Sequence, residues 1–369
     1  MQRNAVPFKH DNNGTAFRCT LSIIHRPLTF MINLISDTIT KPTSPMLAAM
    51  MRAEVGDDVF GSDPTINALE AKAAALFGME AALFCPSGTM TNQIAIKAHT
   101  QPLEEVICDE KSHIFQSEAG GYAFHSGVAV NLLRGEYGLL TADMVEKAIR
   151  PKFDWTPHSS LVVLENTCNH GGGSFYTLNQ VKPISELCQE KGLKLHLDGA
   201  RLFNALVETG ETPAEWGAQF HSISICLSKG LGAPVGSLLL GEKDFIKKAR
   251  RLRKAFGGGM RQAGFLAAAG IYALDNNVQR LKEDNENAKK ISAILKGVSY
   301  VENLRPVMTN IIIFDVKSPL TGDIFLQKLS AKGVQAVLFG PNTVRFVTHL
   351  HITSKMVDEL ITILKNLEI

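Results

Sequence analysis

The stretch LKLHLDGARLFNAL, residues 193–206, and the stretch SISICLSKGLGAPVG, residues 222–236, decide the fold. In each, a short apolar run gives way to polar residues and glycines. The first run ends at Asp198, and the second leads into Lys229. Open α/β sheets place their ligands at the carboxyl ends of the strands, so we expect these two side chains to share a site. A carboxylate that holds a pyridinium N–H and an amine that forms a Schiff base are what pyridoxal phosphate requires.

Composition points to chemistry on a small molecule. Of the 369 residues, 45% are hydrophobic and 20% are charged, which suits a large core and two domains. The formal net charge of +2 gives no reason to expect nucleic acid as a partner. No apolar run reaches the roughly 20 residues of a membrane helix, so we expect no membrane partner. The cysteines are scattered without a C-x-x-C pair, which favours reduced thiols in the cytoplasm over disulfides or a metal site.

Residues 1–30, MQRNAVPFKHDNNGTAFRCTLSIIHRPLTF, differ from the rest of the chain. They are basic and nearly free of acidic residues, as transit peptides are, but they have few serines and no sustained amphipathic pattern. We therefore expect this leader to be disordered or to lie upstream of a functional start at Met31.

From Met31 onward, strand-like and helix-like segments alternate. The expected strands are AALFC, EEVICD, VAVNLL, LVVLEN, LKLHLD, ISICL and SLLLG. The expected helices cover residues 64–77, 87–99, 142–149, 178–191, 200–209 and 242–254, followed by one long helical stretch after Arg261. This alternation predicts an α/β fold with a mostly parallel central sheet and helices on both of its faces.

The chain changes character from about residue 300. The expected strands there are NIIIFDV, VQAVLF and TVRFVTHL, separated by two amphipathic helices. This order predicts a smaller C-terminal α+β domain. We place the large domain at residues 31–275, with residues 31–60 contributing to the site, and the small domain at residues 276–369.

The segment CPSGTMTN, residues 85–92, is a candidate phosphate site. It follows a predicted strand and opens a predicted helix. Ser87, Gly88 and Thr89 would therefore offer hydroxyls and backbone N–H groups at the positive end of a helix dipole. Such a sequence alone is more typical of an ordinary helix cap. The presence of Asp198 and Lys229 favours phosphate binding.

Further polar residues follow two other strands. His113 comes after EEVICD; a lone histidine is often structural, but an imidazole can also stack on a cofactor ring. The segment ENTCNHGGG follows LVVL, and its glycines allow a tight turn near a ligand. We expect Asn169 to hydrogen-bond the cofactor's phenolate oxygen, and Cys168 or His170 to face the substrate.

Three arginines are candidate anion ligands. Arg201 follows Asp198 by three residues and is expected in the same cleft. Arg345 lies in the predicted strand TVRFVTHL, where a buried arginine needs a partner such as a substrate carboxylate. Arg261 follows a triple glycine and suits a second phosphate contact, across a subunit interface if the protein is oligomeric.

Seven motifs, in this order, resemble the threonine aldolases, and the resemblance covers the chain from Met31 onward. The motifs are SDTITKP, GDDVFGSDPTINALE, PSGTMTNQIAI, HLDGARLFNA, LSKGLGAPVGS, GGGMRQAG and VRFVTH. These enzymes use pyridoxal phosphate on the fold of aspartate aminotransferase. The resemblance implies cleavage of L-threonine or L-allo-threonine to glycine and an aldehyde. It also implies a homotetramer, a dimer of dimers with active sites at subunit interfaces.

The resemblance implies a role for each candidate residue. Lys229 would supply the Schiff-base amine, Asp198 would hold the pyridinium nitrogen, and His113 would stack on the ring. Phosphate would be held by Ser87, Gly88, Thr89 and Arg261. The substrate carboxylate would be held by Ser36, Arg201 and Arg345, and Arg201 would also contact the cofactor.

Two departures from the family pattern leave the proton acceptor open. Cys168 stands where the family usually has a histidine near the β-hydroxyl, and VFGSD replaces the usual VYGED. His113 and a phosphate-held water are the alternative bases. The alternative functions are a β-eliminating lyase or aminotransferase of the same fold, and a ligand-binding protein without activity; intact Lys229 and Asp198 oppose the last.

Overall fold

A computed structural model describes residues 32–367, so the predicted leader, residues 1–30, lies outside the described residues. Its centre is a seven-stranded sheet with the order β2-β8-β7-β6-β5-β3-β4. Only β8 runs antiparallel to its neighbours, and this arrangement confirms the predicted mostly parallel α/β fold. The strands are β2 (Ala81–Cys85), β3 (Glu104–Asp109), β4 (Ala129–Leu133), β5 (His158–Glu165), β6 (Lys194–Asp198), β7 (Ser222–Cys226) and β8 (Ser237–Gly241).

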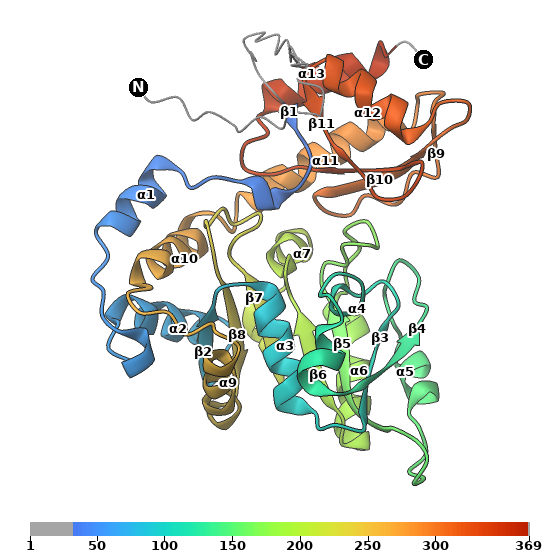
Figure 1. The fold of residues 1–369 in the computed structure, drawn as a ribbon. Coiled ribbons are helices and arrows are strands. Elements are labelled where there is room, and N and C mark those ends of the chain that lie inside the picture. The colour runs from blue at the N-terminus through green and yellow to red at the C-terminus, as the bar shows by residue number, and fades with distance from the viewer. Residues whose placement is uncertain (1–31, 368–369) are drawn as a thin grey trace, which may run out of the picture. The chain divides into compact units, whose positions relative to one another are not determined.

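Helices cover both faces of this sheet (Figure 1). One face carries α3 (Gly88–His99) and α9 (Lys243–Ala255), with the short α4 (His113–Gln116) and the turn η3 (Tyr122–Ser126) beside α3. The other face packs into the largest apolar core. The helices that contribute to that core include α1 (Ser44–Met51), α2 (Pro64–Leu76), α5 (Ala142–Ala148), α6 (Leu178–Lys191), α7 (Leu202–Thr209), α8 (Pro213–Gly217) and α10 (Gly264–Asn276).

Capping residues start the helices where their sequences suggest. Asp63 accepts the backbone N–H groups of Thr65 and Ile66 at the start of α2, and Pro64 occupies its first turn. Ser87 accepts the N–H of Met90 at the start of α3. These caps fix the two helices directly before and after β2.

The C-terminal part has a core of its own. An antiparallel sheet with the order β12-β13-β10-β9 packs against three helices. Its strands are β9 (Val301–Glu302), β10 (Ile311–Val316), β12 (Val337–Leu338) and β13 (Thr343–Val347), and the helices are α11 (Leu281–Leu295), α12 (Gly322–Ala331) and α13 (Ser354–Lys365). Near the start of the described chain, β1 (Ile32–Asn33) pairs in parallel with β11 (Val334–Gln335), so Ile32 and Leu34 join this core. The boundary near residue 275 stays a prediction.

Two element predictions were wrong in detail. The long helical stretch after Arg261 is two helices, α10 and α11, because Asn277 ends α10 and its side chain donates to the backbone oxygen of Leu231 at 2.7 Å. The segment VQAVLF is two short strands, because β11 pairs with β1 while β12 pairs with β13. Among the described helices, none combines the length and apolarity that crossing a membrane takes.

Candidate active site

A pocket of about 150 Å³ opens at the carboxyl ends of β6 and β7. Six of the residues predicted from sequence line it: Ser87, Gly88, Thr89, His113, Asp198 and Lys229. The parallel strands bring these residues together because their carboxyl ends meet at one edge of the sheet.

Asp198 and Lys229 both follow from the strand order. Asp198 ends β6 and is 2% exposed; one of its oxygens accepts the N–H of Ala200 at 3.2 Å and the other accepts the amide of Asn92 at 2.8 Å. Lys229 lies in the turn after β7, and its backbone oxygen accepts the N–H of Gly232 at 2.8 Å. The Lys229 amine has no hydrogen bond or ion pair with any residue among 32–367. A buried anion and an available amine therefore line one pocket.

The amino end of α3 is the third wall of the pocket. Gly88 is needed there because β7 passes close by: a Cβ at this position would lie 2.5 Å from the sulfur of Cys226. This close approach directs the first N–H groups of a 12-residue helix into the pocket. The helix dipole and these donors together favour a bound anion.

His113 is held in place by a buried carboxylate. Its Nδ1 lies 2.9 Å from Glu118, which also accepts the amides of Asn92 at 2.9 Å and Gln93 at 2.6 Å. Burial alone would lower the pKa of His113. The hydrogen bond with Glu118 and the charge of Asp198 outweigh that effect, so the pKa rises above its usual value.

Two arginines lie at the junction of the large sheet with β13. Arg201, which precedes α7, forms a buried two-point ion pair with Asp37, with two N···O distances of 2.7 Å. Burial would raise the pKa of Asp37, but the guanidinium of Arg201 lowers it to about 2. Burial, followed by the nearby charge of Arg201, lowers the pKa of Arg345 to about 10. Arg201 thus pairs with Asp37, and the charges of both residues act on Arg345.

Arg345 comes from β13 and has unused hydrogen-bonding capacity. It donates to the side-chain oxygen of Asn169 at 2.9 Å and to the backbone oxygen of Ile35 at 3.1 Å, and its guanidinium lies over Phe339 at 4.7 Å. Its Nε is buried without a partner among the described residues. Ser36, next in sequence to Ile35, is 8% exposed and caps the turn η1 (Asp37–Ile39). The predicted carboxylate-binding residues therefore gather around Asp37.

The side chain of Cys168 packs inside the large domain. Its side chain is 1% exposed, and its sulfur packs against Gly138, where an added Cβ would lie 2.3 Å away. Backbone hydrogen bonds from Cys168 to Ser174 and from Gly173 to Cys168 turn the residue inward. Cys168 is not among the residues that line the pocket, so its contact with the substrate stays a prediction.

His170, two residues later, lies on the side of the arginines. Its ring stacks on Phe339 at 4.5 Å, the same ring that Arg345 covers. Burial, followed by the charge of Arg345, lowers the pKa of His170 to about 4. Its imidazole is therefore neutral near pH 7 and has a lone pair for a proton.

Arg261 is not brought to the pocket. Its side chain is 53% exposed, pairs with Asp57 at 2.9 Å and lies 5.8 Å from the ring of Phe60. The side-chain oxygen of Asn169, a residue expected at the cofactor, accepts a hydrogen bond from Arg345 at 2.9 Å. The predicted roles of both residues stay predictions.

The sequence interpretation missed four buried polar residues of the site. Asn92 and Glu118 support Asp198 and His113, and Asp37 orients Arg201. Glu165 accepts the backbone N–H groups of His113 at 2.8 Å and Asn169 at 2.9 Å, which ties two strand-end loops together. Burial and then the adjacent charge of Asp198 raise the pKa of Glu165. The motifs SDT and LEN contained Asp37 and Glu165, but only their neighbours were given roles.

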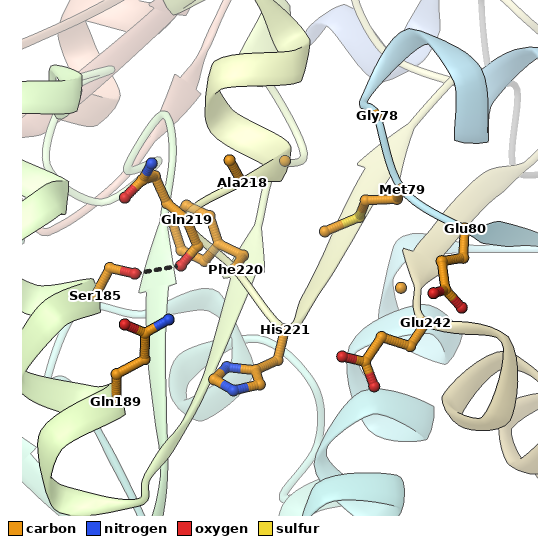
Figure 2. A pocket seen from close by; sticks show the side chains of 12 residues that line it. Gly78, Met79, Glu80, Ser185, Gln189, Ala218, Gln219, Phe220, His221 and Glu242 are labelled. Atoms are coloured by element: carbon orange, nitrogen blue, oxygen red, sulfur yellow. Dashed lines mark hydrogen bonds between the residues drawn. The ribbon is translucent and has the colours of Figure 1, made fainter.

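A second pocket lies at the opposite ends of the strands, near the starts of β2 and β7 (Figure 2). Glu80 and Glu242 lie on one side of it and Ser185 and Gln189 on the other, with His221 between them. The Nδ1 of His221 already accepts the backbone N–H of Leu195 at 3.1 Å. None of the predicted site residues lines this pocket.

Comparison with known proteins agrees with this geometry. A sequence model of the beta-eliminating lyase family matches residues 33–319. The low specificity L-threonine aldolase of Escherichia coli K12 is 42% identical over 331 residues, which span 89% of this chain and 97% of that protein.

Solved structures extend the comparison. A threonine aldolase structure from Leishmania major has a TM-score of 0.81 at 24% identity and covers 91% of this chain and 99% of its own. A single-site variant of serine palmitoyltransferase from S. paucimobilis, solved with a bound aldimine of pyridoxal phosphate and myriocin, shares the fold with a TM-score of 0.72 at 16% identity, over 91% and 86% of the two chains. The extent and identity of the sequence matches assign the chain to the beta-eliminating lyase family and, within it, to the low-specificity L-threonine aldolases.

Proposed function

We propose that this protein cleaves L-threonine and L-allo-threonine to glycine and acetaldehyde with pyridoxal phosphate as its cofactor. The observation that carries the proposal is the pocket shared by the available amine of Lys229 and the buried carboxylate of Asp198. A β-hydroxy-α-amino acid is the substrate class. Its carboxylate matches the cationic pair Arg201 and Arg345.

The residues present fit the cofactor. Lys229 would hold it through its amine, and Asp198 would hold its pyridinium N–H, since this carboxylate lines the pocket. Ser87, Gly88 and Thr89 at the amino end of α3 would hold its phosphate. When bound, pyridoxal phosphate supplies the electron sink that stabilises a carbanion at the substrate Cα.

The arginines would orient the substrate. Arg345 has a buried Nε–H without a partner among the described residues, and such a donor costs free energy that a substrate carboxylate would recover. Asp37 accepts hydrogen bonds from two of the guanidinium nitrogens of Arg201. This arginine would therefore bind the substrate carboxylate through its remaining N–H groups. Fixing the carboxylate fixes the direction of the Cα–Cβ bond, which is the bond that breaks.

His170 is the candidate base for the β-hydroxyl proton. Its neutral imidazole lies on the substrate side, beside Phe339 and Arg345. His113 is the weaker alternative because its raised pKa favours the protonated form. A phosphate-held water is the third candidate and stays open.

The test is product analysis with both substrates in competition. We expect glycine and acetaldehyde from each, and no turnover from Lys229→Ala, because no other amine of the described chain lines the pocket. Release of 2-oxobutyrate and ammonia instead would identify a β-eliminating lyase. Transfer of the amino group of threonine to an added 2-oxo acid would identify an aminotransferase. Either result would refute the aldolase proposal.

We further infer that the protein acts as a homotetramer in the cytoplasm. The exposed Arg261 and the 81% exposed ring of Phe60 support an interface near them, through which Arg261 would reach a second site. The five described cysteines are buried and unpaired, which supports a reducing compartment. Light scattering of the purified protein tests the tetramer; a monomer that retains full activity would contradict it.

A further inference from the structure

A polar seam interrupts the apolar packing between α3 and the sheet. On β6 and β7, His196 lies opposite Ser222 and Asp198 lies opposite Ser224, and all four residues face α3. Each of the four is at most 2% exposed. Apolar clusters fill the same face of the sheet on both sides of the seam. Burying polar groups in this place costs free energy unless each is hydrogen-bonded.

The polar groups of the seam form a continuous chain that ends at Asp198. Ser222 Oγ lies 2.8 Å from His99 Nε2 and 2.8 Å from His196 Nδ1. The other ring nitrogen of His196 lies 3.2 Å from the side-chain oxygen of Asn92. Asn92 in turn donates to Asp198 at 2.8 Å. Asn92 and His99 are seven residues apart on α3, so they lie on the same face of the helix.

The chemistry of the partners fixes the direction of every bond. The amide nitrogen of Asn92 lies between two carboxylates, Asp198 and Glu118, so it must donate and its oxygen must face His196. His196 therefore carries its proton on Nε2, and its Nδ1 accepts the hydroxyl proton of Ser222. That leaves the oxygen of Ser222 to accept from Nε2 of His99. All four donors point toward Asp198.

We propose that His99, Ser222, His196 and Asn92 form a one-way hydrogen-bond relay that positions the carboxylate of Asp198. The proposal rests on the proposed function, in which Asp198 holds the cofactor's pyridinium N–H. Successive hydrogen bonds polarise one another in a low-dielectric interior, so the earlier bonds of the chain strengthen the last one, from Asn92 to Asp198.

Burial keeps the relay neutral. It lowers the pKa of His196 to about 4 and the pKa of His99 well below its usual value. The histidines therefore donate without introducing a cation that would compete with the pyridinium for Asp198. These are positioning residues, because none except Asn92 lines the pocket.

Two serines on β7 give a matched test. Ser222 belongs to the relay, whereas the hydroxyl of Ser224 bonds the hydroxyl of Thr91, at 2.6 Å, and within the described chain it has no hydrogen-bonded link to the side chain of Asp198. Both are fully buried, face the same helix and are two residues apart. We therefore expect a similar decrease in the free energy of unfolding in urea for Ser222→Ala and Ser224→Ala. Only Ser222→Ala interrupts the relay.

The readout is the affinity of the purified apoprotein for pyridoxal phosphate. Loss of one hydrogen bond in the relay should weaken binding by about 2- to 10-fold in Ser222→Ala. It should also shift the pH midpoint of the bound cofactor's absorbance. Ser224→Ala should match the wild type in both measurements. Equal affinities and midpoints in the two variants would overturn the relay.

Imidazole ¹⁵N spectra of the wild-type apoprotein give a second test that needs no variant. We expect His196 and His99 to be neutral and to carry their protons on Nε2. A proton on Nδ1 of His196, or a charged ring, would reverse the direction and overturn the relay. If the wild type shows these tautomers but binds no pyridoxal phosphate, the proposed function is refuted. The role assigned to the relay is then refuted with it.

Discussion

Asp37 is the residue on which the orientation of Arg201 depends. Both side chains are buried, and they meet through two N···O contacts of 2.7 Å. Asp37→Asn keeps the shape but removes the charge, which leaves a buried guanidinium without its counter-ion. Breaking such a pair costs about 3–5 kcal/mol. We expect a loss of this size in urea unfolding, together with a raised KM for threonine.

The stability of Asp37→Asn can also contradict this prediction. Unchanged stability in Asp37→Asn would mean that solvent or another group replaces the carboxylate. Asp143→Asn is the matched control, because this exposed aspartate pairs with Lys147 on the surface of α5 and should change stability by less than about 1 kcal/mol.

Arg345 is predicted to act on binding more than on stability. Its guanidinium contacts Asn169, the backbone of Ile35 and the ring of Phe339, and its Nε is left unsatisfied within the described chain. Arg345→Ala should weaken threonine binding by about 2–5 kcal/mol, because it removes one partner of a buried charge pair. Arg345→Lys should recover only part of this loss, since an ammonium cannot form the planar two-point contact. Steady-state KM values test both; unchanged affinity in Arg345→Ala would refute the carboxylate clamp.

At the scale of elements, the fit between α3 and β7 sets the phosphate end of the pocket. A Cβ on Gly88 would lie 2.5 Å from the sulfur of Cys226, so in Gly88→Ala either α3 or the Cys226 side chain must shift. Overpacking of this kind costs about 1–3 kcal/mol. We expect weaker pyridoxal phosphate binding in Gly88→Ala and recovery in the double variant Gly88→Ala/Cys226→Ala.

Cys226→Ala alone is the control for this prediction. It removes the sulfur without moving α3, so its cofactor affinity should stay near that of the wild type. If the effects of the two substitutions simply add, the contact does not limit the approach of the helix.

The same elements show what the sequence could predict. Asp198 and Lys229 were found because each ends or follows an apolar run, and strand ends are local signals. The packing of Cys168 could not be predicted, because it depends on Gly138, thirty residues away in the chain and in contact with its sulfur. The seam was visible as alternation in HLD and SIS, with polar residues at every second position. The part played by Asn92 was not visible in the sequence, because this residue of α3 reaches the seam only when the helix packs on the sheet.

At the scale of the whole molecule, most polar side chains of the site are buried and form hydrogen bonds with one another. Glu165, Glu118 and Asp37 each accept two or more hydrogen bonds from different segments of the chain. Networks of this kind rigidify a site, because removing one member leaves the others unpaired. These networks also make the free energy of unfolding depend on pH, because a buried group gains or loses a proton less easily than the same group in the unfolded chain.

His196 gives the clearest pH dependence. Its pKa is lowered from 6.5 to about 4 by burial, so between these values the unfolded chain binds a proton that the folded chain does not. The free energy of unfolding contributed by this residue is therefore complete above pH 6.5 and is lost as the pH falls toward 4. At about 1.4 kcal/mol per pKa unit, the loss approaches about 3 kcal/mol.

Urea unfolding of the apoprotein at pH 7 and pH 5 measures about 2 kcal/mol of this loss, because pH 5 still lies above the pKa of the folded state. His196→Gln does not titrate, so it should be less stable than the wild type at pH 7 but lose less stability on going to pH 5. His158→Gln removes a histidine whose side chain is 51% exposed and should keep the pH dependence of the wild type. If His196→Gln loses as much stability between the two pH values as the wild type does, another group carries the acid sensitivity, and the seam is not the part of the molecule that acid opens first.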